Sequence, residues 1–283
     1  MKTIVITGAT GSQGGATARA LVRAGARVRG LTRNTDTPKA KALAALGVEL
    51  VRGDLDDPAS LASAFEGADG VYGVTDFFTN GIAGEITHGK RIADVAKEKK
   101  VPHLVFASVA SADRAPSIPH FASKVEIEKH IAAIGQPATI LGPTIFMEDL
   151  TEKKYVPPAN WGMFRKIVGP DRPIHWIGVD DIGAIAAKVF FDRERFVGKK
   201  LAIATDRRSI TEARSVFEAV DGKRPFAFAM PTWMFSRLVS DDLVKMWTWM
   251  ASHEFDADVE ATRKLLPEAR DMTAWLRAKR GRA

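Results

Sequence analysis

The sequence predicts an α/β protein built on a doubly wound parallel sheet of the Rossmann type, with a smaller C-terminal α/β lobe. Short β-rich runs alternate with helical stretches through the first half of the chain. A strand, a glycine-rich turn and a helix also follow one another at the N-terminus. We therefore expect a Rossmann domain over residues 1–150 and a smaller lobe over residues 151–283, packed as one unit with it.

The elements of the first half follow a strand–helix rhythm that repeats six times. Strands are expected over residues 4–6, 27–31, 48–52, 70–74, 103–107 and 138–141, and helices over 16–24, 39–46, 60–65, 85–99 and 122–134. The rhythm breaks after Pro143, and turn signals fill residues 151–176. A helix over 181–191, a strand over 201–204 and a helix over 211–220 are expected in the second half.

The composition is that of an ordinary globular protein, with 46% hydrophobic and 27% charged residues in 283. The net charge of +7 is concentrated in clusters at expected helix ends, so nucleic acid is not the expected partner. The chain has no cysteine, and no apolar run reaches the roughly 18 residues that cross a bilayer. With no secretory signal visible at the N-terminus, we expect a cytoplasmic protein.

The glycine-rich turn carries the main functional signal. Gly8, Gly11 and Gly14 recur every three residues directly after the first expected strand. Such a turn lets bare backbone approach a pyrophosphate, and the helix that starts near Ser12 directs its N–H groups and positive end at the phosphates. The strand–turn–helix context supports a dinucleotide site. The remaining expected contacts of the turn are Thr10, Ser12 and Gln13.

The end of the second strand bears on which nucleotide binds. Arg33 follows this strand about 20 residues after the glycine turn, where an arginine accommodates the 2′-phosphate of NADP. Asn34 and Lys39 are expected to assist it. The alternative is that Arg33 is a surface residue and Asp36 is the discriminating acid, which would select NAD.

Two further strand ends are expected to line the same crevice. Asp54 and Leu55 close the third strand, where the adenine edge should lie, although Asp54 could instead cap the helix that begins near Pro58. Val74 and Thr75 end the fourth strand, on the ribose side of the crevice.

The motifs taken together resemble those of the NmrA-like family of atypical short-chain dehydrogenases/reductases, and the resemblance covers almost the whole chain. The residues that carry it lie at 8–15, 31–33, 53–55, 74–76, 120–124, 142–149, 262–267 and 273–276. The resemblance implies NADP(H) as the cofactor. In a reductase, Pro143, Thr144 and Phe146 are expected to cover the nicotinamide face.

The chain departs from typical short-chain reductases at their Tyr-x-x-x-Lys pair. Its two tyrosines, Tyr72 and Tyr155, do not stand four residues before a lysine, and the matching place reads His120-x-x-x-Lys124. Relatives that keep only the lysine include reductases, some of them quinone reductases, and redox sensors that report the nucleotide state to partner proteins. The absent tyrosine therefore argues against ordinary alcohol dehydrogenase chemistry.

Three residues are candidates for the catalytic site. Lys124 would hold the nicotinamide ribose, unless it only pairs with Glu128 on an exposed helix face. His120 would donate a proton, unless it only begins a helix after Pro119. Ser108 would bind substrate, unless it only ends a strand.

Two functions are compatible with these residues. The first is an NADPH-dependent reductase of a small quinone or conjugated carbonyl, and Phe77, Phe78, Trp161 and Trp176 are the expected apolar substrate wall. The alternative is a non-catalytic NADP(H) redox sensor that acts through protein partners, with residues 79–89 as a loop that moves. The six histidines lack metal-ligand spacing, so no metal is expected, and the protein should be a monomer or homodimer.

Overall fold

A seven-stranded sheet forms the centre of the computed structural model, which describes residues 1–153 and 157–281. The strand order is β3-β2-β1-β4-β5-β6-β9, and neighbouring strands are parallel throughout. The order reverses between β1 and β4, which creates a crevice at the carboxyl ends of these strands. The doubly wound Rossmann sheet predicted from the sequence is confirmed. Its strands are β1 (Thr3–Ile6), β2 (Arg27–Thr32), β3 (Glu49–Arg52), β4 (Gly70–Gly73), β5 (Leu104–Ala107), β6 (Ala138–Pro143) and β9 (Lys200–Ile203).

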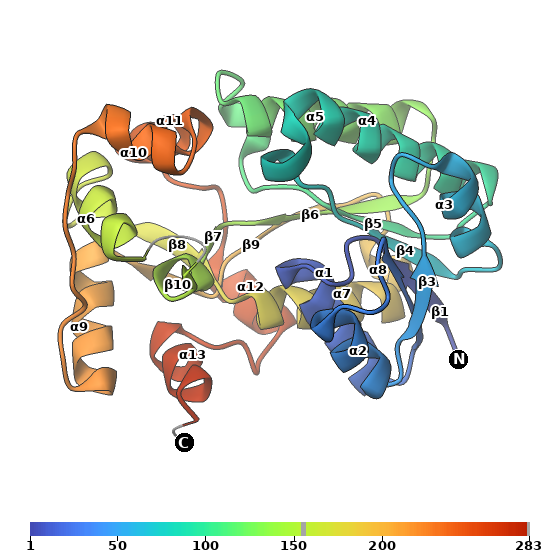
Figure 1. Ribbon diagram of the computed structural model, residues 1–283, viewed down its shortest axis with the longest axis horizontal. Helices are drawn as coiled ribbons and strands as arrows, with labels where there is room; N and C mark the ends of the chain where they lie inside the picture. Colours follow the sequence, from blue (N-terminus) through green and yellow to red (C-terminus); the bar gives the residue numbers. More distant parts are fainter. Residues whose placement is uncertain (154–156, 282–283) are drawn as a thin grey trace.

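Helices cover both faces of this sheet, as Figure 1 shows. Side chains along a strand alternate between the faces, so Ile4 and Ile6 of β1 pack into one core and Val5 packs into the other. One face carries α1 (Ser12–Arg23) and α7 (Val179–Phe191), and the other carries α3 (Pro58–Phe65), α4 (Phe77–Glu98) and α5 (Pro119–Ala133). Two shorter helices, α2 (Pro38–Ala45) and α8 (Arg193–Phe196), complete this half.

Residues 79–89 do not form the loop that was expected from their glycines. They lie in α4, which begins at Phe77, and the Asp76 side chain caps its first turn by accepting from the Phe78 N–H. The helix breaks only at Gly81, whose φ of 67° lies in the left-handed region that glycine tolerates. An N-cap and one permissive glycine thus allow a helical start that hydrophobic periodicity did not indicate.

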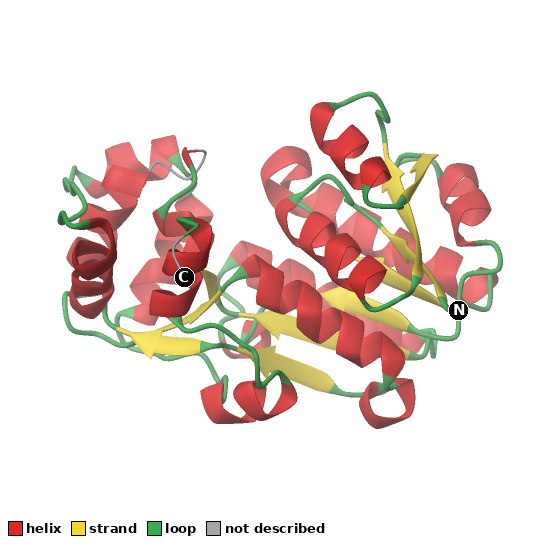
Figure 2. Ribbon diagram, turned by 90° about the horizontal axis from the view of Figure 1, so that it is seen from below, coloured by secondary structure: helices red, strands yellow, loops and turns green. Residues whose placement is uncertain are grey.

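A second lobe lies beside the main sheet (Figure 2). Its three-stranded sheet consists of β7 (Ile145–Phe146), β8 (Ile174–Ile177) and β10 (Asp206–Arg208), in the order β10-β8-β7. The helices of the second half are α6 (Pro157–Ile167), α9 (Ile210–Asp221), α10 (Thr232–Leu238), α11 (Asp241–Met250), α12 (Val259–Leu265) and α13 (Met272–Lys279). Two 3-10 turns, η1 (Ala112–Arg114) and η2 (Met147–Leu150), complete the described elements.

Segments that follow residue 150 contribute to the main body as well as to the second lobe. After β8 the chain returns to the main body, where α7 packs on α1 and β9 extends the main sheet beside β6. The helix contact is close: a Cβ on Gly183 would stand 2.6 Å from the backbone carbonyl carbon of Ala16. Buried Glu148 joins the two halves, because it accepts from the Val179 N–H and from the Trp275 indole. Burial raises the pKa of the Glu148 carboxyl.

Candidate functional site: a cleft from the glycine turn to Lys124

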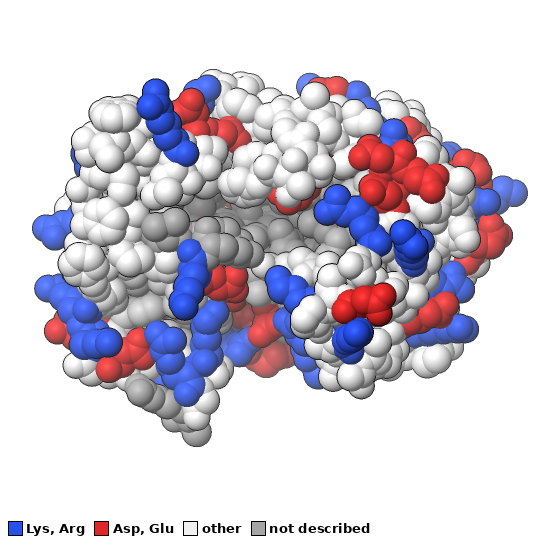
Figure 3. Space-filling model, in the orientation of Figure 1, with Lys and Arg blue, Asp and Glu red and all other residues white. Residues whose placement is uncertain are grey.

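A cleft of about 890 Å³ opens at the carboxyl ends of the central strands. Its walls come from the β1–α1 turn, the ends of β2 to β6, the start of α4, and α10 and α11 of the second half. Figure 3 shows the hollow in the middle of one face, with Lys and Arg side chains at its rim. The strand reversal therefore places the cleft where Rossmann-type proteins bind nucleotides.

The glycine turn forms one wall by close backbone packing. Gly8 has a φ of 59°, and the Gly11 N–H donates to its carbonyl oxygen at 2.9 Å. A Cβ on Gly14 would stand only 2.2 Å from that same oxygen. Gly8, Thr10, Gly11, Ser12, Gln13 and Gly14, all expected at the nucleotide, line the cleft. The glycines are thus required by sterics, and they leave the N-terminus of α1 facing the cleft.

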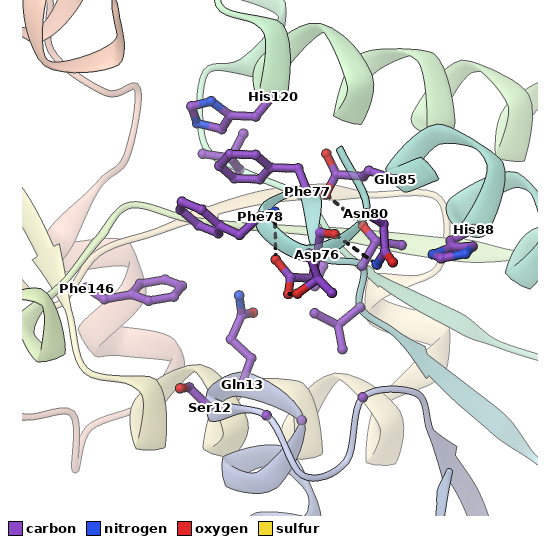
Figure 4. Close-up of a pocket in the computed structure, with 18 of the residues that line it drawn as sticks. Ser12, Gln13, Asp76, Phe77, Phe78, Asn80, Glu85, His88, His120 and Phe146 are labelled. Carbon is purple, nitrogen blue, oxygen red and sulfur yellow. Dashed lines mark hydrogen bonds between the residues drawn. The ribbon is translucent and has the colours of Figure 1, made fainter. Parts of the chain in front are cut away.

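Gln13 is held in place by a buried tyrosine. The Tyr72 hydroxyl of β4 donates to Gln13 Oε1 at 3.2 Å, and Figure 4 shows Gln13 directed into the cleft from the start of α1. Burial strongly raises the pKa of the Tyr72 phenol, so it stays protonated and acts as a donor. Tyr155, the other tyrosine, lies outside the described residues.

At the end of β2, the geometry places Arg33 and not Asp36 at the cleft. Arg33 and Asn34 are exposed and line it. The Asp36 side chain is 84% exposed and lies 3.8 Å from Lys41, outside the cleft wall. Lys39 also lies outside the wall, on the exposed side of α2, so the structure does not bring it to the predicted site.

The N-cap of α3 decides between the two roles predicted for Asp54. Asp57, not Asp54, caps this helix by accepting from the Ala59 N–H. Asp54 and Leu55 line the cleft, as do Val74 and Thr75 at the end of β4. The structure therefore gathers these four residues with the glycine turn.

Lys124 is buried at the cleft, and its partners differ from the exposed pair considered from the sequence. Its ammonium donates to Thr75 Oγ1 at 2.7 Å and lies 2.9 Å from Glu85 Oε1. Glu128 instead accepts from Lys200 and from Ser108. Ser108 lines the cleft, and its hydroxyl donates a hydrogen bond to the Glu128 carboxylate.

Sequence reasoning missed Glu85, which is 1% exposed. Its carboxylate accepts from Thr75 and Ser123 in addition to pairing with Lys124. One signal was available: Glu85 lies on the same helical stripe as Gly89, Ile92 and Ala96, all of them buried. An acid on an apolar stripe indicates a buried partner of opposite charge.

His120 is the second residue of α5, and it lines the cleft. Its Nδ1 lies 2.6 Å from Oδ2 of Asp242 in α11. This partner could not be predicted from the sequence, because it comes from the other half of the chain.

Aromatic and aliphatic side chains form the remaining walls. Phe77 and Phe78 line the cleft as expected and stack on one another at 4.1 Å between ring centroids. Trp161 and Trp176 do not reach it, because both are buried in the core of the second lobe, where Trp161 packs on Phe217. The other residues of these walls are Pro143, Thr144, Ile145, Phe146, Leu238, Val239, Leu243, Met246 and Trp247.

Neither a membrane span nor a metal cluster is found in residues 1–153 and 157–281. No helix there is long and apolar enough to cross a bilayer. No group of three or more His, Asp or Glu side chains converges as metal ligands would.

The fold and the cleft define a Rossmann-type α/β protein whose glycine turn opens onto a partly apolar site. The model of the NmrA-like family matches residues 1–276, so the chain belongs to the NmrA-like family. An NmrA-like family domain-containing oxidoreductase of Aspergillus flavus, lnaB, is 31% identical over 257 residues, covering 82% of this chain and 77% of that protein. A Cladobotryum oxidoreductase of the same description, FrzB, is 28% identical over 258 residues, with 81% and 77% covered.

Solved structures share the fold over nearly the whole chain. NmrA, a negative transcriptional regulator solved with NADP, gives a TM-score of 0.78 at 21% identity, covering 98% of this chain and 94% of that one. An NADPH-dependent quinone oxidoreductase of Escherichia coli gives 0.74 at 21% identity, with 98% and 99% covered. The triphenylmethane reductase of Citrobacter sp., solved with NADP(H), gives 0.76 at 20% identity, with 98% and 99% covered.

Proposed function

We propose that this protein binds NADPH and uses it to reduce a small, flat, conjugated acceptor such as a quinone. One observation carries the proposal: a buried lysine, Lys124, lies in the same cleft as the glycine turn and Arg33. The cleft thus combines a nucleotide cradle with a charged group beside an apolar wall, which a purely structural cavity does not need.

The residues present fit the cofactor. Because Gly14 lacks a Cβ, the Gly8 backbone packs directly against the start of α1. Backbone N–H groups of this turn and the N-terminus of α1 would hold the pyrophosphate. Arg33 would hold the 2′-phosphate through charge-assisted hydrogen bonds. Lys124 would hold the nicotinamide ribose. The NADP(H) complexes of NmrA and of the triphenylmethane reductase support this choice of nucleotide.

Bound NADPH supplies a hydride, and the protein's own residues orient the acceptor and exclude water. Phe77, Phe78 and Phe146 offer flat apolar contacts to a conjugated ring. His120 or water supplies the proton that accompanies the hydride. The similarity to a quinone oxidoreductase and to a triphenylmethane reductase supports an aromatic acceptor.

The test is NADPH oxidation at 340 nm with a panel of quinones and enones. Wild-type protein should turn over at least one quinone. Lys124→Ala should lose turnover while still binding NADPH, and Lys129→Ala, an exposed lysine on the same helix, should behave as wild type. NADPH binding without turnover of any acceptor would overturn the reductase.

A redox sensor is the second candidate. The observation that favours it is apolar exposure at the rim of the cleft, where the side chains of Phe78 and Leu238 are 57% and 51% exposed. A partner that covers this rim would detect whether the cleft is filled. The sensor would be supported if the protein shows no turnover and captures a partner in an NADP(H)-dependent way. Capture of the same partner with and without NADP(H) would exclude it.

A further inference from the structure

A histidine and an aspartate from opposite halves of the chain meet at the cleft. His120 is the second residue of α5, and Asp242 is the second residue of α11. Asp242 Oδ2 lies 2.6 Å from His120 Nδ1, and its Oδ1 accepts from the His120 backbone N–H at 3.3 Å. The two side chains are 9% and 12% exposed. One carboxylate therefore fixes both the backbone and the ring of His120.

Aromatic rings fix the plane of the same imidazole. The Phe77 ring stacks on it at 4.9 Å with an interplanar angle of 12°, and Figure 4 shows Phe77 beside His120. Phe121 meets it edge-on at 4.8 Å. Within residues 1–153 and 157–281 no group hydrogen-bonds to Nε2 of this ring. Nε2 is thus the ring nitrogen available to a molecule in the cleft.

Of the charged side chains near the His120 ring in the described residues, Asp242 is the one that contacts the ring directly. Lys124, one turn further along α5, is neutralised by Glu85 of α4. Asp76, before α4, accepts from Phe78 and Thr79.

On α11 itself, the other charged residues near the start, Asp241 and Lys245, are exposed. A carboxylate that accepts a hydrogen bond from Nδ1–H selects the tautomer whose Nε2 is basic. The same carboxylate stabilises the imidazolium that forms when Nε2 is protonated. This is the arrangement that general acid–base catalysis requires of a histidine.

We propose that Asp242 is the positioning residue that makes His120 the proton donor of the reduction, an inference that rests on the proposed function. Bound NADPH would supply the hydride, which is one hydrogen with two electrons. The Nε2–H bond of protonated His120 breaks, and its proton forms the O–H bond on the acceptor oxygen. His120 is left neutral and regains its proton from water, so a quinone becomes a hydroquinone and NADPH becomes NADP⁺.

The same helix shapes the acceptor site. Leu243, Met246 and Trp247 of α11 line the cleft, while its first turn holds the imidazole. An acceptor that packs on α11 would therefore meet an acid whose orientation is set by that helix.

The first experiment compares Asp242→Asn with Asp241→Asn, its exposed neighbour in the same helical turn. With NADPH and 1,4-naphthoquinone, Asp242→Asn should lower kcat about 100-fold with little change in KM. The pH profile of kcat should change in Asp242→Asn and stay as in wild type in Asp241→Asn, because Asp242 contacts the ring. Asp242→Glu should recover part of the rate. Equal kcat and equal pH profiles in the two asparagine variants would overturn the inference.

A second experiment needs no turnover. The ring signals of His120 are followed by NMR against pH, and His120→Gln identifies them. In Asp242→Asn that still binds NADPH, this transition should differ from that of wild type, because the ring has lost its carboxylate partner, whereas in Asp241→Asn it should stay in place. If the NMR transition of His120 in Asp242→Asn is the same as in wild type, the role proposed for Asp242 is overturned, with or without enzymatic turnover. Absence of turnover in wild type, with the transition moved, overturns the proposed function instead.

Discussion

The Lys124 ammonium lies 2.9 Å from Glu85 Oε1, and the two side chains are almost completely buried. Thr75 completes a closed triangle, because its hydroxyl accepts from Lys124 and donates to Glu85. The pair places a cation at the cleft without leaving a net charge in a poorly solvated site. Such a pair is costly to break, since each partner compensates the desolvation of the other.

Breaking this pair from one side should therefore cost more than removing both charges. Lys124→Met and Glu85→Gln should each lower the free energy of unfolding by about 3 kcal/mol, and the double variant by less than the sum of the two. Urea unfolding of the four proteins measures the coupling. The exposed pair Lys90 and Glu126, joined at 2.6 Å, is the matched control, and its changes should cost below about 1 kcal/mol. Additive effects at Lys124 and Glu85 would contradict the coupling.

Arg33→Ala should weaken NADPH binding about 10- to 100-fold and leave NADH binding nearly unchanged, because only NADPH offers the 2′-phosphate. Fluorescence titration with both nucleotides measures the difference. Lys39→Ala removes a nearby exposed cation outside the cleft wall and should change neither affinity. Equal losses of affinity for NADPH and NADH in Arg33→Ala would show that this arginine does not bind the 2′-phosphate.

Gly14→Ala should abolish nucleotide binding, because its new Cβ would stand 2.2 Å from the Gly8 carbonyl oxygen. The turn must then open, at a cost of about 1–3 kcal/mol in stability. Gly15→Ala, on the next residue of α1, places a Cβ 3.2 Å from the Ala9 oxygen and should be milder. NADPH titration and thermal unfolding of both variants rank the two effects, and equal behaviour would refute the steric argument.

His103 should make the protein sensitive to acid. Burial, with help from Arg193 and Lys2, lowers the pKa of His103 from its ordinary 6.5 to about 4. The neutral ring is therefore favoured in the folded state, and its Nε2 lies 2.8 Å from the Thr139 hydroxyl. Stability from this group is present above pH 6.5 and is lost as the pH falls toward 4.

Between pH 7 and pH 4, wild type should lose about 3 kcal/mol more unfolding free energy than His103→Gln. Urea unfolding at the two pH values measures the difference. His253→Gln, at an exposed histidine, is the control and should lose as much as wild type. The same pH dependence in His103→Gln and wild type would show that another group is responsible.

The residues predicted from the sequence at the glycine-turn end of the cleft do line it, apart from Lys39, because they are local in the chain. Gly8, Gly11 and Gly14 mark a backbone that only glycine allows, and strand ends place Arg33 and Asp54 by topology alone. The acceptor end could not be predicted in this way. Trp161 and Trp176 were expected there because aromatic residues favour such walls, but they fill the core of the second lobe.

The sequence by itself determined the Rossmann sheet, the glycine turn and the position of Lys124, because each depends on periodicity or on the steric demands of neighbouring residues. Tertiary structure alone decided the partners of that lysine and of His120. Glu85 and Asp242 reach them from α4 and α11, helices whose packing brings distant segments together. Burial then makes those contacts strong, since a charge removed from water must find its partner within the fold.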